Sequence, residues 1–149
     1  MDGKYYSSER SVQLLISLLK QHGIKKIVAS PGTTNLSFVA SLQQDEWFEV
    51  YSSVDERSAA YLACGMAEES GEPVVLSCTG ATASRNYIPG LTEAYYRKLP
   101  VLAVTSTQDI SRIGHHIAQV IDRRVIQNDI ALLSEYRPAT DDSAKEWSN

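Results

Sequence analysis

The chain has 149 residues, 43% of them hydrophobic and 21% charged, which are the proportions of one globular domain with a real core. A net charge of −4 gives no electrostatic reason to bind nucleic acid, and no apolar run is long enough to span a membrane. Residues 1–5 begin no signal-peptide pattern, and Cys64 and Cys78 lie far apart in apolar surroundings. These features predict a cytoplasmic protein with buried free thiols and no metal site.

The chain opens with a helical pattern followed by a strand pattern. Apolar residues recur at helical spacing over residues 7–22, with Ser7 or Ser8 as the predicted cap and Gly23 as the stop. Residues 24–29 then predict a short buried strand.

The same alternation continues in the next third of the chain. A small, polar turn at 30–35 leads into a helix to about residue 45, which Thr34 or Asn35 is predicted to cap and which carries Leu36 on its apolar side. Residues 48–54 predict a strand, and a helix of small residues runs from Glu56 to about residue 70.

Two further strands are predicted in the middle of the chain. Residues 73–78 form a continuous apolar run, as expected for a strand covered on both faces. A second small-residue turn at 79–86 leads into a helix over 83–97, and 100–105 is predicted to be another buried strand. Alternating strands and helices indicate an α/β fold with a parallel sheet and helices on both faces.

The pattern weakens after this fourth strand. Residues 106–114 are predicted to be loop, residues 115–126 a short helix, and residues 132–137 a last short strand. Residues 138–149 are polar and end where another helix could begin.

Three of the predicted turns follow the carboxyl ends of strands, where ligands bind in open α/β sheets. They are 30–35, 55–57 and 79–86. None is a phosphate-binding glycine fingerprint, because no Gly-Lys-Ser/Thr follows Gly32 and no Gly-x-x-Gly partner accompanies Gly80. Hydroxyls, backbone groups and the carboxylates of this edge would suit a flat heterocycle with hydrogen-bonding atoms.

Four segments in this order carry a family resemblance: ASPG at 29–32, VDERSAAYLACGMA at 54–67, CTGATASRNY at 78–87 and LPVLAVT at 99–105. Together they resemble the N-terminal pyrimidine-binding domain of thiamine-diphosphate enzymes, a group that includes acetolactate synthase, 2-oxo acid decarboxylases and the menaquinone-pathway carboligase. The resemblance covers about residues 8–137. It implies a flavodoxin-like three-layer sandwich and an enzyme that decarboxylates or carboligates a 2-oxo acid.

The resemblance implies a catalytic role for Glu56. In the family, the matching glutamate hydrogen-bonds a ring nitrogen of the cofactor's aminopyrimidine and promotes the tautomer that removes the thiazolium C2 proton. A partly desolvated carboxylate suits this proton sharing. The alternative is that Asp55 and Glu56 only favour the positive end of the helix dipole.

The resemblance also implies cofactor contacts from both flanking turns. The matching positions are Pro31, Gly32, Thr79, Gly80, Ala81, Thr82 and Asn86.

Substrate contacts are implied for a third group of residues. Gln119, with Asp122 three positions on, resembles a Gln-x-x-Asp feature whose glutamine faces substrate, although a surface glutamine is the alternative. His115 and His116 resemble a histidine pair that handles protons and the substrate carboxylate in some members, or else lie in a solvated loop. Thr33 belongs to the first turn, where the menaquinone-pathway enzyme carries Ser-Arg.

The resemblance implies a partner for this chain. Family members hold the diphosphate and Mg²⁺ through a second domain with Gly-Asp-Gly and Asn-Asn motifs, and residues 1–149 contain neither. We therefore expect a pyrimidine-binding domain that stops before its last helix and strand, inactive alone, and paired with a diphosphate-binding domain in a homo-oligomer.

A non-catalytic flavodoxin-like binding or regulatory subunit is the alternative function. The glutamate at position 56 argues against it.

Overall fold

The computed structural model describes residues 6–80, 82–123 and 125–137. The predictions for Ala81 and for residues 138–149 lie outside the described residues.

Four parallel strands form one sheet in the order β2-β1-β3-β4. These strands are β1 (Lys26–Ala29), β2 (Glu49–Ser52), β3 (Val74–Cys78) and β4 (Val101–Thr105). Because all four run the same way, their carboxyl ends share one edge.

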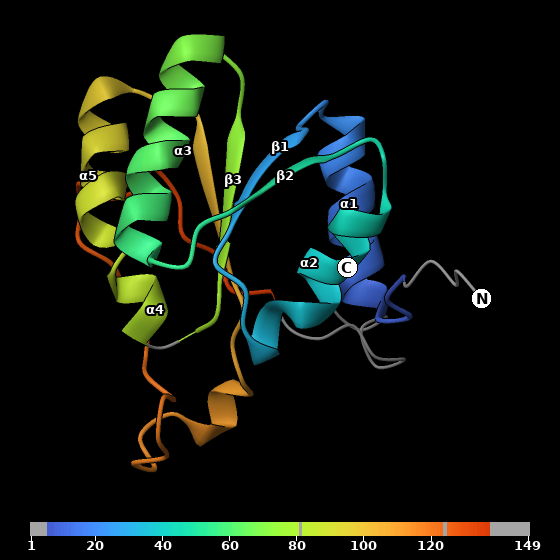
Figure 1. The fold of residues 1–149 in the computed structure, drawn as a ribbon. Coiled ribbons are helices and arrows are strands. Elements are labelled where there is room, and N and C mark those ends of the chain that lie inside the picture. Colours follow the sequence, from blue (N-terminus) through green and yellow to red (C-terminus); the bar gives the residue numbers. More distant parts are fainter. Residues whose placement is uncertain (1–5, 81, 124, 138–149) are drawn as a thin grey trace, which may run out of the picture.

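Helices cover both faces of the sheet (Figure 1). One face carries α1 (Arg10–Gln21) and α2 (Leu36–Gln44), and the other carries α3 (Glu56–Ser70), α4 (Thr82–Arg85) and α5 (Ile88–Arg97). The predicted three-layer α/β sandwich is confirmed.

The strand β3 is buried from end to end, as its continuous apolar run predicts. Val75 packs into a cluster with Ile16 and Leu42 from the helices of one face. Val74 and Leu76 pack into the second cluster, which α3 and α5 close on the other face. The two clusters form one hydrophobic core on each side of the sheet.

Several local signals are also confirmed. The Asp55 carboxylate caps α3, since its Oδ1 accepts a hydrogen bond from the Ser58 N–H at 2.7 Å. Gly71 ends α3 with a φ of 68°, and Gly23 follows α1 with a φ of 70°. Both glycines adopt the left-handed conformation that ends many helices.

The predicted serine cap of the first helix is wrong, whereas Asn35 does precede α2 as predicted, although its side chain makes no capping hydrogen bond to that helix. Glu9, not a serine, precedes α1, and the Ser7 hydroxyl instead accepts a hydrogen bond from the Glu9 N–H at 3.1 Å. A short 3₁₀ helix, η1 (Thr33–Asn35), precedes α2, and this extra turn leaves Leu36 60% exposed.

The single helix predicted over 83–97 is two helices. The chain turns between α4 and α5, where Asn86 N–H and Tyr87 N–H bond to carbonyls only three residues back. Pro89 lies in the first turn of α5, where its missing N–H costs nothing.

The prediction that the fourth strand is buried is also wrong. Leu102 and Ala103 are exposed because β4 is the edge strand among the described residues.

The end of the described chain differs from its prediction. A 3₁₀ helix, η2 (Ile110–Arg112), lies within the predicted loop. The described residues of 115–126 form turns, and 132–137 form no strand. His116 and Gln119 have φ values of 53° and 63°, which a right-handed helix cannot contain.

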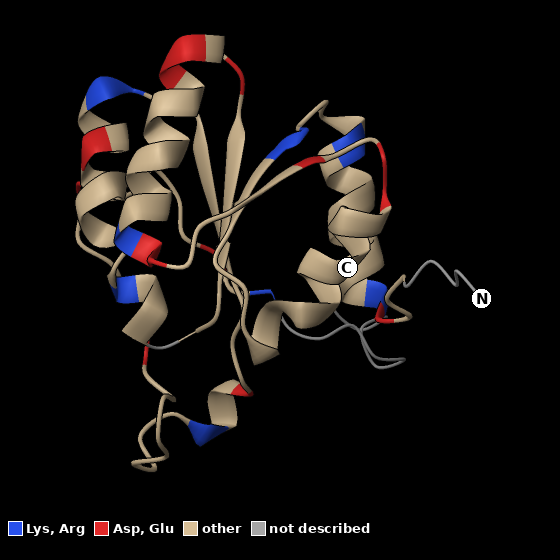
Figure 2. Ribbon diagram, viewed as in Figure 1, with Lys and Arg blue, Asp and Glu red and all other residues tan. Residues whose placement is uncertain are grey.

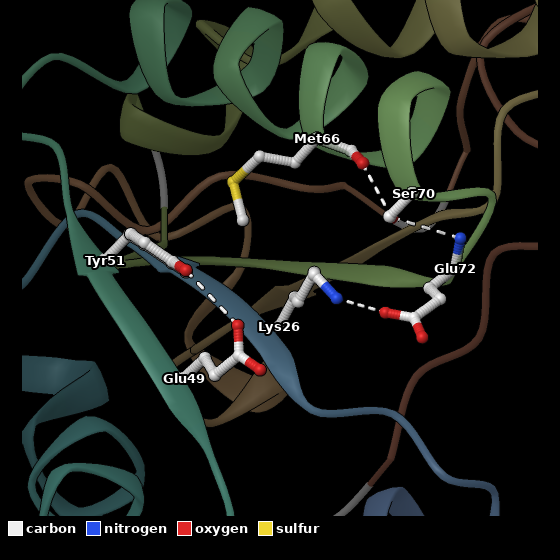
Figure 3. A network of polar contacts seen from close by, with 6 residues as sticks. All are labelled: Lys26, Glu49, Tyr51, Met66, Ser70 and Glu72. Carbon is white, nitrogen blue, oxygen red and sulfur yellow. Dashed lines mark hydrogen bonds and ion pairs between the residues drawn. The ribbon is translucent and has the colours of Figure 1, made fainter.

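Charged residues are spread over the ribbon and gather on no single element (Figure 2). At the amino edge of the sheet, Lys26 forms an ion pair with Glu72 (Figure 3). The Tyr51 hydroxyl donates a hydrogen bond to Glu49, which lies two residues earlier on the same strand, β2. Lys26 and Glu49 are the first residues of their strands, so this network lies at the opposite edge from the predicted site. No helix in the described ranges is long and apolar enough to cross a membrane.

Close packing of α3 against α5 depends on Gly90. A Cβ atom at this position would lie 2.4 Å from the Cβ of Ala60, which is itself fully buried. Gly90→Ala is therefore expected to destabilise the protein by about 1–3 kcal/mol, because the two helix backbones must move apart. Urea denaturation of variant and wild type measures this difference.

Gly65→Ala is the matched control. Gly65 lies in α3 with open space around its Cβ position, so alanine should be neutral or stabilise by up to about 1 kcal/mol. Equal stability of the two variants would contradict this account of the helix packing.

Candidate functional site

The carboxyl edge of the sheet is organised by the side chain of Asn35, which is almost fully buried. Its Oδ1 accepts a hydrogen bond from the Gly32 N–H at 2.8 Å. Its Nδ2 donates to the Ser30 carbonyl and to the Ser77 hydroxyl, both at 3.2 Å. The amide thus folds the turn after β1 and ties it to β3.

The turns after β1 and β3 touch each other. A Cβ on Gly32 would lie 2.3 Å from Cγ2 of Thr79. Gly32 has an extended backbone, so it is the close approach and not the backbone conformation that excludes a side chain here.

The turn after β4 is equally close to Gly80. A Cβ on this glycine would lie 2.5 Å from the Ser106 carbonyl oxygen and 3.2 Å from Nη2 of Arg123. The backbone of each glycine therefore packs closely against a neighbouring turn: Gly32 against the Thr79 side chain, and Gly80 against the Ser106 carbonyl. The sequence predicted only that the turns share an edge.

A cavity of about 110 Å³ opens between these turns. Most of its lining residues carry hydroxyl, amide or guanidinium groups, and none carries a carboxylate or an aromatic ring. They are Thr33, Thr34, Thr79, Gly80, Ser106, Thr107, Gln108, Gln119, Val120, Ile121 and Arg123.

Glu56 begins α3 at the same edge and is half-buried. It does not line the cavity. Burial is the main cause that raises the pKa of the Cys78 thiol and of the Tyr87 hydroxyl, and the Glu56 charge adds a smaller effect in the same direction. Asp55, beside Glu56, is committed to the helix cap.

Cys78 and Tyr87 are buried next to one another. Burial raises the pKa of Cys78 to about 11 and raises the pKa of Tyr87 well above its usual range. The Tyr87 hydroxyl has no hydrogen bond of good geometry among the described residues, although the Cys78 thiol and the Ser30 hydroxyl lie beside it. Both groups stay neutral at physiological pH.

The remaining predicted cofactor residues are more exposed. Pro31, Thr82 and Asn86 lie on the surface at the same edge, and the Asn86 amide donates to the Thr82 carbonyl at 3.3 Å. Of the predicted cofactor residues, Thr79 and Gly80 therefore line the cavity, Gly32 lies against Thr79, and Pro31, Thr82 and Asn86 lie outside the cavity.

The predicted substrate residues divide into two groups. Thr33 and Gln119 line the cavity, and Gln119 does so with a left-handed backbone that is costly for a residue other than glycine. His115 and His116 are exposed in the preceding turn and do not line it.

Sequence reasoning missed Asn35, Tyr87 and Arg123 as site residues. Asn35 was interpreted only as a helix cap, and Tyr87 was interpreted as part of one continuous helix. Arg123 follows the Gln-x-x-Asp feature directly, and a cation beside that feature was the available signal.

Comparison with known sequences identifies the family. The sequence model described as "Thiamine pyrophosphate enzyme, N-terminal TPP binding domain" matches residues 10–126. The chain therefore belongs to the thiamine-pyrophosphate enzymes and forms their N-terminal TPP-binding domain.

Two curated relatives of this chain carry the same protein name. The chain is 37% identical over 143 residues to a 2-succinyl-5-enolpyruvyl-6-hydroxy-3-cyclohexene-1-carboxylate synthase of Porphyromonas gingivalis, covering 95% of this chain and 25% of that protein. It is 32% identical over 142 residues to a synthase of the same name in Phocaeicola vulgatus, covering 95% of the chain and 26% of the relative. The chain thus spans about a quarter of the length of these relatives.

Solved structures share the fold. A thiamine diphosphate-dependent 4-hydroxybenzoylformate decarboxylase of Rhodococcus jostii superimposes with a TM-score of 0.66 and 22% identity, covering 73% of this chain and 20% of that one. At this identity the likeness concerns the fold alone.

The neutral pair at the end of β3 predicts a pH dependence of stability. The pKa of Cys78 is raised in the folded state from 9.0 to about 11. Its contribution to the stability of the folded state is therefore fully present below pH 9 and is lost as the pH rises toward 11. Raising the pH from 7.5 to 10.5 should therefore lower the free energy of unfolding by at most about 2 kcal/mol through the ionisation of this thiol.

Urea unfolding of wild type and Cys78→Ala at both pH values measures this contribution. The variant starts less stable but should lose less stability at pH 10.5 than the wild type does. An identical loss in both proteins would show that the thiol is not held neutral by the fold.

Proposed function

We propose that this chain is the pyrimidine-binding part of an enzyme that uses thiamine diphosphate to decarboxylate or carboligate a 2-oxo acid. The observation that carries the proposal is the placement of Glu56. Glu56 is the first residue of α3, at the carboxyl edge of the sheet, and it is half-buried. This placement occurs in a chain of the thiamine-pyrophosphate family.

The edge fits a flat heterocycle. Gly32 and Gly80 have no side chains where the Thr79 side chain and the Ser106 carbonyl approach them, so the turns can lie close together along this edge. Thr79 adds a hydroxyl beside Gly32. These residues would hold the cofactor, which when bound supplies a carbanion equivalent and an electron sink for chemistry next to a carbonyl.

Glu56 would hold a proton at a ring nitrogen of the bound pyrimidine. Its half-buried position weakens solvation of the carboxylate, which favours sharing a proton with a bound base. The neutral Cys78 and Tyr87 do not offer a competing counter-charge. Asp55 caps α3 and so fixes the first turn of the helix, which carries Glu56.

The substrate is proposed only as a class. The relatives are synthases of one named product, but the chain covers about a quarter of each, and Thr33-Thr34 stands where the Ser-Arg of the resemblance would lie. We propose a 2-oxo acid donor whose contacts include Thr33 and Gln119. The exposed His115 and His116 are secondary candidates.

The diphosphate and its Mg²⁺ are proposed to bind a domain outside these 149 residues. That domain would belong to the same protein or to a second subunit, and it would cover the carboxyl edge of this sheet.

We also propose that the protein is a homo-oligomer that uses the outer face of α3. The alanines of this helix are buried against the sheet and α5, which leaves Tyr61, Leu62 and Gly65 exposed. Leu62→Glu should therefore shift sedimentation of the full-length protein toward smaller species without unfolding it. Leu14→Glu, on the opposite helical layer and equally exposed, is the control, and a wild-type monomer would refute the proposal.

The central test concerns Glu56. In the full-length protein with bound cofactor, Glu56→Gln should slow exchange of the cofactor C2 proton by roughly 10²–10⁴-fold, since the variant cannot share a proton with the pyrimidine. Exchange followed by NMR after transfer to deuterated water measures this rate directly and needs no substrate.

Asp55→Asn is the matched control. Asparagine caps helices about as well as aspartate, so the fold and the exchange rate should both remain near wild type. A Glu56→Gln protein that exchanges as fast as this control would remove the proposed role of Glu56.

A further inference from the structure

Arg123 is a half-buried cation that has no anionic partner among the described residues. Its Nη2 donates to the Ser106 carbonyl at 3.2 Å, while its Nη1 is buried with no hydrogen bond among the described residues. No ion pair to this guanidinium is found within residues 6–80, 82–123 and 125–137. Burial lowers the pKa of Arg123, yet an arginine remains protonated.

An unpaired buried N–H costs about 1–3 kcal/mol, and more on a charged group. By contrast, Arg97 lies on the surface and pairs with two anionic neighbours, Glu68 and Glu93. Among the described residues, Arg123 has a buried N–H group without a hydrogen bond and no carboxylate of this kind beside it. It is therefore a candidate group for binding an anionic ligand.

The protein makes room for this guanidinium. Gly80 has no side chain at the point where a Cβ would come within 3.4 Å of the Arg123 Cζ atom. Gln119, four residues earlier, adopts the left-handed backbone conformation and lines the same cavity as the arginine. The loop is thus shaped so that the cation reaches the cavity from the carboxyl edge of the sheet.

The lining defines what the cavity can hold. It presents threonine hydroxyls and the amides of Gln108 and Gln119 around one cation, with no carboxylate to neutralise it. Val120 and Ile121 supply limited apolar surface, and no aromatic ring is available to stack on an aryl group. A small acid with additional oxygen atoms fits this lining better than an arylglyoxylic acid.

We infer that Arg123 binds the carboxylate of the substrate and selects a small, oxygen-rich aliphatic 2-oxo acid. The guanidinium can meet a carboxylate with two parallel N–H donors, which lysine cannot do. This inference rests on the proposed function, because it assigns the cavity to the acid that the enzyme transforms. It makes Arg123 a substrate-binding residue and gives it no part in moving protons.

The test measures binding without catalysis. Oxamate, a 2-oxo acid analogue with an unreactive amide carbonyl, is titrated by calorimetry into the full-length enzyme loaded with thiamine diphosphate and Mg²⁺. Oxamide, which lacks the carboxylate, is the companion probe. Wild type should bind oxamate at least about tenfold more tightly than oxamide, as expected for a charge-assisted contact.

Arg123→Met should remove most of this preference, Arg123→Lys should retain part of it, and oxamide binding should not change. Arg97→Met removes the same charge from an exposed position and should leave both affinities as they are. Circular dichroism confirms that each variant is folded.

Two results would overturn the inference. One is equal oxamate affinity in folded Arg123→Met and wild type. The other is a wild-type enzyme that prefers oxamide, binds both equally or binds neither, which decides the question even if the variants do not fold. C2-proton exchange in Arg123→Met should stay at the wild-type rate, so failure of the Glu56 proposal is seen separately.

Discussion

One buried amide constrains the whole carboxyl edge of this domain. Asn35 accepts from the N–H of Gly32 and donates to both Ser30 and Ser77, so it joins the turn after β1 to the neighbouring strand β3. Each of these groups would be costly to bury alone, and together they satisfy each other. Because Asn35 fixes the turn after β1, Gly32 lies against Thr79, which lines the cavity.

The layered architecture could be predicted because its signals are local. A continuous apolar run marks β3, Gly71 adopts the left-handed conformation that ends α3, and Asp55 caps that helix. Each signal requires only a few neighbouring residues. The family resemblance adds the order of these elements, and the match over residues 10–126 agrees with it.

The errors come from tertiary contacts that no local pattern contains. The burial of β4 was inferred from its apolar residues, but burial depends on a neighbour that the described chain does not supply. Asn35 resembles a helix cap in sequence, yet its amide bonds a strand 42 residues away. The role of Arg123 depends on Gly80 and Ser106, which are distant in sequence and meet it only in the folded state.

Glu56 and Arg123, both described residues of this edge, form no ion pair with each other. Burial is the main reason why the pKa of the Cys78 thiol is raised, while the Glu56 charge raises it further and the Arg123 charge lowers it. Had Glu56 and Arg123 been in contact, they would have neutralised each other as an ion pair, and neither would be available to a ligand. The Cys78 thiol and the Tyr87 hydroxyl are kept neutral by their burial. Among the described residues, the edge therefore carries an unneutralised carboxylate and an unneutralised guanidinium together with neutral groups. Such an arrangement suits the proposed site, which would share a proton with a base and bind an acid at the same time.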